Sequence, residues 1–203
     1  MRLGLFGGTF DPPHTGHLIA AQDAALALRL DRVLFVPAAL PPHKQHRTVT
    51  PAPYRLRMLT LALGADARFA LDALELERPG PSYTVDSLRE LRDRLPGEWT
   101  LLLGADQYAE FGTWREPEEV RRLATIGVLE RGGAPARPAP AAVVQEEPDG
   151  VVRVAVTRVD ISSTAIRQRV SAGVSIRYLV PAGVEAFIAE TGLYARNGTS
   201  AAG

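Results

Sequence analysis

The sequence contains no cysteine, and Lys44 is the single lysine among its 23 basic side chains. The absence of cysteine excludes a disulfide framework, a cysteine-ligated zinc site and a thiol nucleophile. The 23 acidic side chains bring the net charge of the 203-residue chain to zero when histidine is counted as neutral. A chain without excess positive charge is a poor candidate for coating nucleic acid, so we expect no nucleic-acid partner.

Long hydrophobic runs are also missing from the sequence. No apolar window approaches the length that spans a bilayer, and the first residues reach glycine and proline too early for a signal peptide. We therefore expect a cytoplasmic protein without a membrane segment. With 46% hydrophobic and 23% charged residues, the composition is typical of a globular domain and too apolar for a disordered chain.

Short apolar runs alternate along the chain with longer stretches that repeat apolar residues at helical spacing. The predicted strands cover residues 2–6, 32–36, 68–76, 100–103, 125–129 and 151–159. The predicted helices cover residues 18–28, 56–63, 84–95, 116–123, 163–171 and 184–190. This alternation indicates an α/β fold, with a Rossmann-like, mostly parallel sheet and helices on both of its faces.

Residues 132–150 are rich in alanine, proline and glycine. We interpret them as a surface loop rather than a domain linker, because only about fifty residues follow, which is marginal for an independent core. The chain is therefore predicted to form a single domain over residues 1–195, with a short helical subdomain at about 160–195. Residues 196–203 are predicted to be a frayed tail.

The loop that follows the first predicted strand reads GGTFDPPHTGH. In an open parallel sheet, ligands bind at the carboxyl ends of strands, where helix N-termini converge. Gly7 and Gly8 would let the backbone approach a ligand closely, and Thr9 offers a hydroxyl. His14 and His17 lie on the same side of the first turn of the next helix, and each can donate a hydrogen bond or a positive charge to a phosphate.

This loop has two other interpretations. It could be a tight turn whose histidines are merely exposed, since both the Gly-x-Gly-x-x-Gly and the Gly-Lys-Ser/Thr phosphate motifs are absent from the sequence. It could also belong to a zinc site, because the pairs His14/His17 and His43/His46 have the same spacing. Proline-rich loops hold such ligands poorly, so we rank the zinc site below the phosphate site.

A second segment near the C-terminus offers similar chemistry. Ser162, Ser163 and Thr164 open a predicted helix and supply hydroxyls at its N-terminus. Arg167 stands one turn further on, where its guanidinium can reach the same anion as the first backbone amides. On its own this segment could equally be an ordinary helix cap followed by a surface arginine.

Together, these two segments resemble the signatures of the nucleotidyltransferase superfamily with the His-x-Gly-His motif. The first signature is His14–His17, which reads HTGH, and the second is Ile161–Arg167, which reads ISSTAIR. The resemblance implies a fold of the nucleotidyltransferase type. It also implies that residues 162–164 and Arg167 bind the β- and γ-phosphates of ATP.

Further segments resemble one family of this superfamily, the nicotinate-nucleotide adenylyltransferases, over nearly the whole chain. These segments are Pro41–Lys44, Glu77–Thr84, Leu103–Gln107, Phe111–Trp114, Tyr178–Pro181 and Gly192–Tyr194. The resemblance implies transfer of the adenylyl group of ATP to nicotinate mononucleotide, which gives deamido-NAD and pyrophosphate in NAD biosynthesis. It also implies Mg²⁺ as a cofactor, bound mainly through ATP phosphates and water, and no protein ligand to the metal.

The resemblance gives each candidate residue an expected role. The expected catalytic residues are His14, His17 and Arg167. The expected ATP-binding residues are Gly7, Gly8, Thr9, Phe10, His17, Gly104, Asp106, Ile161, Ser162, Ser163, Thr164 and Arg167. The expected nicotinate mononucleotide-binding residues are Lys44, Thr84, Trp114 and Arg131.

The residues assigned to the mononucleotide also have ordinary alternatives. Lys44 is a point charge suited to phosphate, or a solvated surface lysine. Trp114 is a stacking platform for the nicotinate ring, or an aromatic residue of the core. Thr84 caps a helix, or its backbone N–H meets the nicotinate carboxylate. The role of Arg115 stays open, because some family members carry an aromatic residue at that position.

Three rival functions stay open at the level of the sequence. The chain could be another nucleotidyltransferase, for example one acting on phosphopantetheine, although residues 81–84 and 111–114 argue against it. It could be a nucleotide-binding regulator without turnover, although His14, His17 and Arg167 argue against that. It could also be a zinc-binding interaction module. The sequence leaves open the preference between nicotinate and nicotinamide, and whether the chain is a monomer or a homo-oligomer.

Overall fold

Seven strands lie in one sheet within the part of the chain that the structure, a computed structural model, describes, namely residues 1–39, 49–131, 144–147 and 149–196. Their order is β3-β2-β1-β4-β5-β7-β6, and all neighbours are parallel except β6 and β7. The strands are β1 (Arg2–Gly8), β2 (Arg32–Pro37), β3 (Phe69–Leu71), β4 (Glu98–Gly104), β5 (Thr125–Arg131), β6 (Val144–Glu147) and β7 (Val151–Val156). The predicted α/β fold with a mostly parallel sheet is confirmed.

The order of the strands changes direction beside β1. From β1 the chain builds β2 and β3 to one side, and it then returns to build β4, β5 and β7 on the other side. β1 therefore pairs with both β2 and β4, and Leu5 has Leu34 as one neighbour and Leu101 as the other. Such a switch point leaves a crevice at the carboxyl ends of the two central strands, which is where ligands bind in open α/β sheets.

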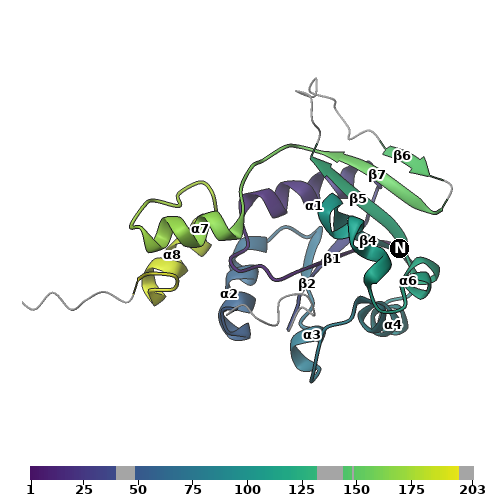
Figure 1. The fold of residues 1–203 in the computed structure, drawn as a ribbon, viewed down its shortest axis with the longest axis horizontal. Coiled ribbons are helices and arrows are strands. Elements are labelled where there is room, and N and C mark those ends of the chain that lie inside the picture. Colours follow the sequence, from purple (N-terminus) through teal and green to yellow (C-terminus); the bar gives the residue numbers. More distant parts are fainter. Residues whose placement is uncertain (40–48, 132–143, 148, 197–203) are drawn as a thin grey trace, which may run out of the picture.

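Helices cover both faces of this sheet (Figure 1). On one face lie α1 (Thr15–Ala27) and α2 (Ala52–Leu63), and on the other lie α4 (Thr84–Arg94) and α6 (Pro117–Leu123). The remaining helices are α3 (Leu74–Glu77), α5 (Ala105–Ala109), the 3₁₀ turn η2 (Phe111–Thr113), α7 (Ser163–Ser171) and α8 (Ala182–Thr191). The predicted covering of both faces is thus confirmed.

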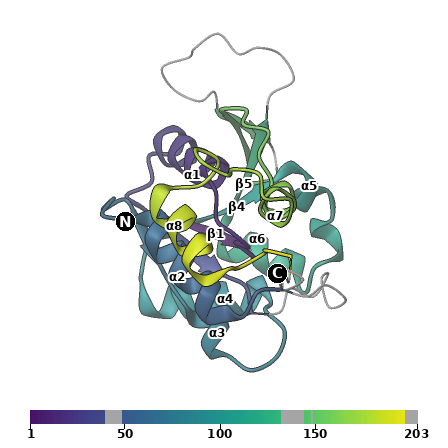
Figure 2. The same ribbon diagram turned by 90° about the vertical axis from the view of Figure 1, so that its left-hand side faces the viewer.

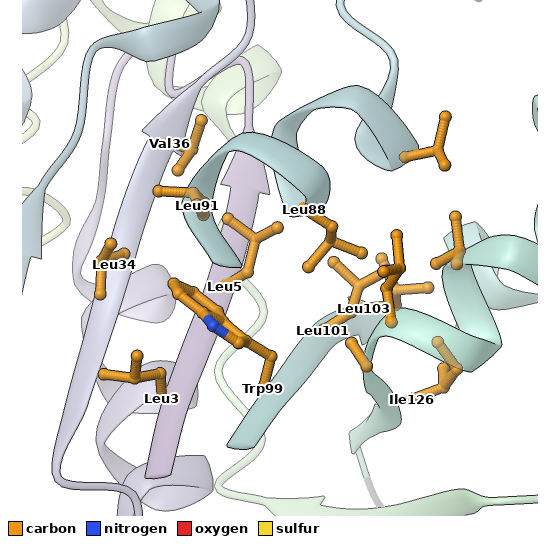
Figure 3. Packing of buried hydrophobic residues seen from close by; sticks show 14 of the residues in the cluster. Leu3, Leu5, Leu34, Val36, Leu88, Leu91, Trp99, Leu101, Leu103 and Ile126 are labelled. Atoms are coloured by element: carbon orange, nitrogen blue, oxygen red, sulfur yellow. The ribbon is translucent and has the colours of Figure 1, made fainter. Parts of the chain in front are cut away.

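The two apolar layers follow from the two-residue period of the strands. Leu3 and Leu5 of β1 pack with Leu91 of α4, whereas Phe6 of β1 joins the layer that contains α1 and α2. Figure 3 shows the first layer, in which Trp99 of β4 lies among these leucines. Because all these side chains are buried, hydrophobic burial fixes the sheet between its helices and sets the position of the strand ends.

The last two helices pack beside α2, away from the sheet (Figure 1), and Figure 2 views the molecule from their side. Ile166 of α7 and Val184 of α8 form a third apolar cluster with Met58 of α2. In addition, Thr15 at the start of α1 donates its backbone N–H to the carbonyl of Leu179 at 3.0 Å. The C-terminal segment is thereby held against the loop that follows β1.

Two predicted segments differ in the structure. The predicted strand at 68–76 is wrong beyond Leu71, where β3 ends and α3 follows. Its alternating apolar residues indicated further strand, but Oδ1 of Asp72 accepts the backbone N–H of Leu74 at 3.0 Å and begins a helical turn. The predicted loop at 132–150 contains the edge strand β6, which antiparallel pairing with β7 stabilises. Most of the remainder of that loop lies outside the described residues.

Smaller differences concern the C-terminal part of the chain. β7 ends at Val156 rather than at residue 159. The predicted tail at 196–203 lies outside the described residues except for Arg196. Within the described ranges, no helix is long and apolar enough to cross a bilayer.

Candidate active site

Two cavities meet at the carboxyl end of β1, beside the switch point of the sheet. The larger cavity has a volume of about 680 Å³ and the smaller one about 380 Å³. Both are lined by Gly7, Gly8, Thr9 and Gln107. The loop after β1 and the first turns of α5 therefore form the wall that the cavities share, and molecules bound in the two cavities would meet there.

The loop after β1 has a tight conformation that its glycines permit. Phe10 has a φ of 48°, in the left-handed region. A Cβ at Gly8 would lie 2.9 Å from the Phe10 ring, whereas a Cβ at Gly7 would meet nothing within 4 Å. Position 8 therefore has no room for a side chain beside the Phe10 ring. The open space at Gly7 allows a ligand to approach the backbone.

His14 and His17 stand at the start of α1 and stack on each other. Their ring centroids are 3.6 Å apart, and Nδ1 of His17 accepts the backbone N–H of His14 at 3.1 Å. Because Nδ1 is the acceptor, a neutral His17 carries its proton on Nε2. A Cβ at Gly16 would come within 3.1 Å of Nδ1 of His14, so a larger residue between the two histidines would press on the His14 ring. Both histidines line the larger cavity.

The start of α7 forms another side of the larger cavity. Oγ of Ser162 caps the helix by accepting the backbone N–H of Ala165 at 3.1 Å. Oγ of Ser163 donates to the carbonyl of Pro12 at 2.8 Å, which fixes α7 to the loop after β1. The lining residues of this segment are Ile161, Ser162, Ser163, Thr164 and Arg167. The structure thus brings the two sequence motifs together around one cavity.

Arg167 reaches back from α7 to the same loop. Its Nη1 donates to the carbonyl of Asp11 at 2.6 Å, and its Nη2 donates to Oγ1 of Thr164 at 3.3 Å. A guanidinium has five N–H donors in a planar fork, so it can bind an anion while these two bonds fix its position. The three predicted catalytic residues His14, His17 and Arg167 all line the larger cavity.

Arg55 of α2 is a buried cation that the sequence analysis did not assign. Its side chain is 2% exposed, and its Nη1 donates to the carbonyls of Thr9 at 2.9 Å and Ala38 at 2.8 Å. Nε donates to the carbonyl of Thr50 at 2.9 Å. Burial lowers the pKa of this guanidinium, and the charge of Asp11 opposes that shift. The sequence signal was a charged residue directly before the predicted helix at 56–63, at helical spacing from the apolar residues Leu59 and Leu63.

Asp11 is a second buried residue that holds the loop after β1. Its Oδ1 accepts the hydroxyl of Tyr194 at 2.6 Å, and its Oδ2 accepts the backbone N–H of Thr50 at 3.1 Å. Burial raises the pKa of Tyr194, and the hydrogen bond to Asp11 adds to the shift. The Asp11 carboxylate therefore serves the structure of the loop and connects it to the C-terminal segment.

The smaller cavity brings together two of the residues predicted to bind the mononucleotide. Thr84, the first residue of α4, and Trp114, which follows η2, both line it. The Trp114 ring is half-buried and packs 5.5 Å from the Phe111 ring, measured between centroids. The Trp114 ring thus packs against Phe111 and also lines the cavity, which is the arrangement that a stacking platform for a flat ring needs.

Arg115 also lines the smaller cavity. Its guanidinium lies 4.7 Å from the centroid of the Tyr83 ring, at cation–π distance. It also forms ion pairs with Asp86 at 3.8 Å and Glu116 at 3.6 Å. This side chain therefore belongs to the wall of the cavity, a place that the sequence analysis left open.

Of the other predicted site residues, one does not line either cavity, and two have side chains outside the described part of the structure. Asp106 is exposed and is not among the described residues that line either cavity, whereas Gly104 lines the larger one. Gln107, the next residue, lines both cavities instead and was not among the predicted site residues. Its Oε1 accepts the backbone N–H of Gly104 at 3.3 Å. Lys44 and the side chain of Arg131 lie outside the described part of the structure.

The alternative of a zinc site receives no support from the part of the chain that is described. Among those residues, no group of three or more histidine, aspartate or glutamate side chains could hold a metal ion. His43 and His46, the second pair of that hypothesis, lie outside the described residues.

A family model for cytidylyltransferase-like proteins matches residues 5–169, which include both motifs. The chain therefore belongs to this family of nucleotidyltransferases. Its relatives narrow the class further. A probable nicotinate-nucleotide adenylyltransferase from Thermus thermophilus is 50% identical over 96% of this chain and 100% of the relative. Another with the same description, from Geobacillus thermodenitrificans, is 44% identical over 95% of this chain and 86% of the relative. Within the larger family, the chain is a member of the nicotinate-nucleotide adenylyltransferases.

Solved structures agree on the fold. A Plasmodium falciparum nicotinic acid mononucleotide adenylyltransferase, complexed with NaAD, matches with a TM-score of 0.72 and 17% identity over 95% of this chain and 97% of that chain. A putative nicotinate-nucleotide adenylyltransferase from Vibrio parahaemolyticus matches with a TM-score of 0.69 and 18% identity over 95% of this chain and 94% of that chain. At these identities the likeness establishes the architecture alone.

Proposed function

We propose that this chain transfers the adenylyl group of ATP to nicotinate mononucleotide, giving deamido-NAD and pyrophosphate in NAD biosynthesis. The observation that carries the proposal is the pair of cavities that share the loop after β1. One contains two histidines and the start of α7, and the other contains Trp114 and the start of α4. A reaction that joins two nucleotides needs two such adjoining sites, and the named relatives support this choice of substrates.

In this proposal ATP occupies the larger cavity. His14 and His17 bind the α-phosphate, and Arg167 with the hydroxyls of residues 162–164 binds the leaving pyrophosphate. Gly7, together with the other expected residues of the loop, contacts the nucleotide through its backbone. Gly104 also lies at this cavity. Asp106, being exposed, would have to reach the nucleotide from the rim.

Nicotinate mononucleotide occupies the smaller cavity. Its ring stacks on Trp114, and its ring carboxylate approaches the start of α4 at Thr84, where the helix N-terminus favours an anion. Lys44 and Arg131 remain proposed contacts of the mononucleotide, and Lys44 is proposed to bind its phosphate.

The reaction itself needs little chemistry from side chains. A phosphate monoester is ionised at neutral pH, so its oxygen can attack the α-phosphorus of ATP without a general base. The bond from the phosphate oxygen to the α-phosphorus forms as the bond to pyrophosphate breaks on the opposite side. Catalysis then consists of positioning and of stabilising charge on the α-phosphate and the leaving group. His14, His17 and Arg167 have the chemistry for the second task.

We also propose Mg²⁺ as a cofactor that is bound mainly through ATP phosphates and water. The donor set of the larger cavity fits this mode, because Asp11, the carboxylate among its described lining residues, already accepts hydrogen bonds from Tyr194 and Thr50. Mg²⁺ retains several waters readily and needs no dedicated protein cage. When bound, it would neutralise phosphate charge.

The domain organisation and the setting of the enzyme complete the proposal. We expect residues 1–195 to act as one domain whose last part, at about 160–195, is a helical subdomain, and the shared cluster of α2, α7 and α8 supports this. We expect the reaction to take place in the cytoplasm, where ATP is available. The proposal is compatible with a monomer and with a homo-oligomer.

Pyrophosphate release from ATP tests the proposal directly. The chain should release pyrophosphate with nicotinate mononucleotide, and deamido-NAD should form in equal amount. Nicotinamide mononucleotide and phosphopantetheine are assayed in parallel as acceptors, because other nucleotidyltransferases of the superfamily act on them. Release with phosphopantetheine alone, or with none of the three acceptors, would refute the proposed function.

A further inference from the structure

Glu75 of α3 is a buried carboxyl group in the wall of the smaller cavity. It is 8% exposed, and its Oε1 accepts the hydroxyl of Ser87 at 2.6 Å. A second hydrogen bond joins it to Ser82. Nothing in the proposed reaction uses this group. Because a buried carboxylate is costly unless it is paired and hydrogen-bonded, its partners need to be identified.

The donors around Glu75 form a connected network. Nη2 of Arg78 donates to Oγ of Ser87 at 3.1 Å, and Ser87 in turn donates to Glu75. The arginine therefore compensates the buried carboxylate through the serine hydroxyl, since a hydrogen bond from a cation polarises the next bond in the chain. The network directs its hydroxyl donors at one acceptor, which fixes the positions of all its members.

These members come from three separate parts of the cavity wall. Ser82 lies in the loop before α4, and its Oγ also accepts the backbone N–H of Ala39, which follows β2, at 2.9 Å. Ser87 lies in the first turns of α4. Glu75 thus connects α3, the loop before α4, the start of α4 and, through Ser82, the segment after β2. Tyr83 and Thr84, which line the cavity, lie between the two serines.

We propose that Glu75 is a positioning residue for the ring end of the mononucleotide. By holding Ser82 and Ser87, it fixes the start of α4 at the distance from Trp114 that the flat nicotinate ring requires. This inference rests on the proposed function, because it assigns the smaller cavity to the mononucleotide. It predicts an effect on that substrate and none on ATP, whose cavity does not include Glu75 among its lining residues.

The variant Glu75→Gln tests the inference in the full chain. It is nearly the same size, but its amide replaces one of the two acceptor oxygens with a donor and removes the negative charge, so it accepts the serine hydroxyls more weakly than the carboxylate does. We expect the KM for nicotinate mononucleotide to rise about tenfold, with kcat and the KM for ATP within about twofold of wild type. The matched control is Glu77→Gln, which removes an exposed glutamate from the same helix and should leave all three constants unchanged.

The serine variant Ser87→Ala provides a second, milder test that preserves the fold if Glu75→Gln does not. It should raise the same KM about threefold. The double variant Glu75→Gln/Ser87→Ala should be no worse than Glu75→Gln alone, because both changes break one network. An unchanged or lower KM for the mononucleotide in the single variants, or an equal rise in the KM for ATP, would overturn the positioning role.

The wild-type assay separates the two proposals. If the wild-type chain releases no pyrophosphate with nicotinate mononucleotide, the proposed function fails and this inference fails with it. If the wild type is active and Glu75→Gln and Ser87→Ala both retain its KM, the inference alone fails.

Discussion

The orientation of His17 is fixed by its neighbours independently of any substrate. Nδ1 accepts the backbone N–H of His14, and the imidazole forms a T-shaped pair with the Phe10 ring at a centroid distance of 5.1 Å. Nε2, on the far side of the imidazole, is the nitrogen that we expect to donate to the α-phosphate. The variant His17→Asn should therefore lose about two to three orders of magnitude in kcat, because its short amide can accept the His14 N–H but cannot reach the phosphate.

The matched variant for this prediction is His17→Gln, whose longer side chain can place an amide N–H near the position of Nε2. It should retain more activity than His17→Asn, although less than wild type. Pyrophosphate release measures both, and circular dichroism verifies that each variant is folded. Wild-type turnover by His17→Asn would contradict the assignment of His17.

Replacing Trp114 tests whether the nicotinate ring stacks on its indole in the smaller cavity. The indole packs against Phe111 and lines the cavity, so replacing it removes the surface on which the nicotinate ring would stack. We expect Trp114→Ala to raise the KM for nicotinate mononucleotide about tenfold at saturating ATP, and Trp114→Phe to raise it less. An unchanged KM in the alanine variant would refute stacking.

At the scale of elements, the C-terminal segment is joined to the loop after β1 by the hydroxyl of Tyr194. That hydroxyl donates to Asp11 at 2.6 Å inside the protein. The variant Tyr194→Phe leaves the carboxylate with one donor fewer and should lower the free energy of unfolding by about 1–2 kcal/mol, as measured by denaturant titration. It should also lower kcat, because Arg167 of α7 is held by a hydrogen bond to the carbonyl of the same Asp11.

Tyr178 provides the control for that experiment. It lies in the same C-terminal segment but is 83% exposed, so Tyr178→Phe should leave both stability and turnover unchanged. Equal stability of the two variants would mean that the Tyr194 hydroxyl does not couple the segment to the loop.

The same elements show what sequence could and could not predict. Strands with a strong apolar run, such as β1 and β2, were predicted within two residues of their ends, because local burial determines them. β6 was missed, since its strand form depends on pairing with β7 rather than on its own sequence. β3 and α3 were merged, because alternation continues across Asp72 while a side-chain hydrogen bond ends the strand.

At the scale of the whole molecule, the site residues that belong to a contiguous sequence motif were predictable. The contacts that form only when distant segments come together in the fold were not. His14, His17 and Arg167 were found because each belongs to a recognisable segment. The buried, structural roles of Arg55 and of Asp11, which stands in the same loop segment as His14 and His17, were not predictable, because their hydrogen-bond partners come from distant positions of the sequence. Their role is to fix loops around the cavities, and only the fold brings together the carbonyls and donors that they bind.

The stability of the whole molecule should also depend on pH through Glu75. Burial raises the pKa of this carboxyl above its ordinary value of 4.5, and the hydrogen bonds from Ser87 and Ser82 and the charge of Arg78 offset only part of the shift. Between the unfolded and folded pKa values, the unfolded chain has released a proton that the folded chain still holds. The contribution of Glu75 to stability is therefore complete below the unfolded pKa and declines as the pH rises through the folded one.

This sign can be measured with the same pair of glutamine variants. Denaturant titrations at a series of pH values from about 4 upward give the free energy of unfolding of wild type, Glu75→Gln and Glu77→Gln. The wild-type value minus the Glu75→Gln value should fall as the pH rises, because only the wild type must ionise a buried carboxyl in order to remain folded. Glu77→Gln corrects for the loss of one negative charge from the same helix. A difference that instead grows with pH would mean that the network of Ser82, Ser87 and Arg78 stabilises the ionised form more than burial destabilises it.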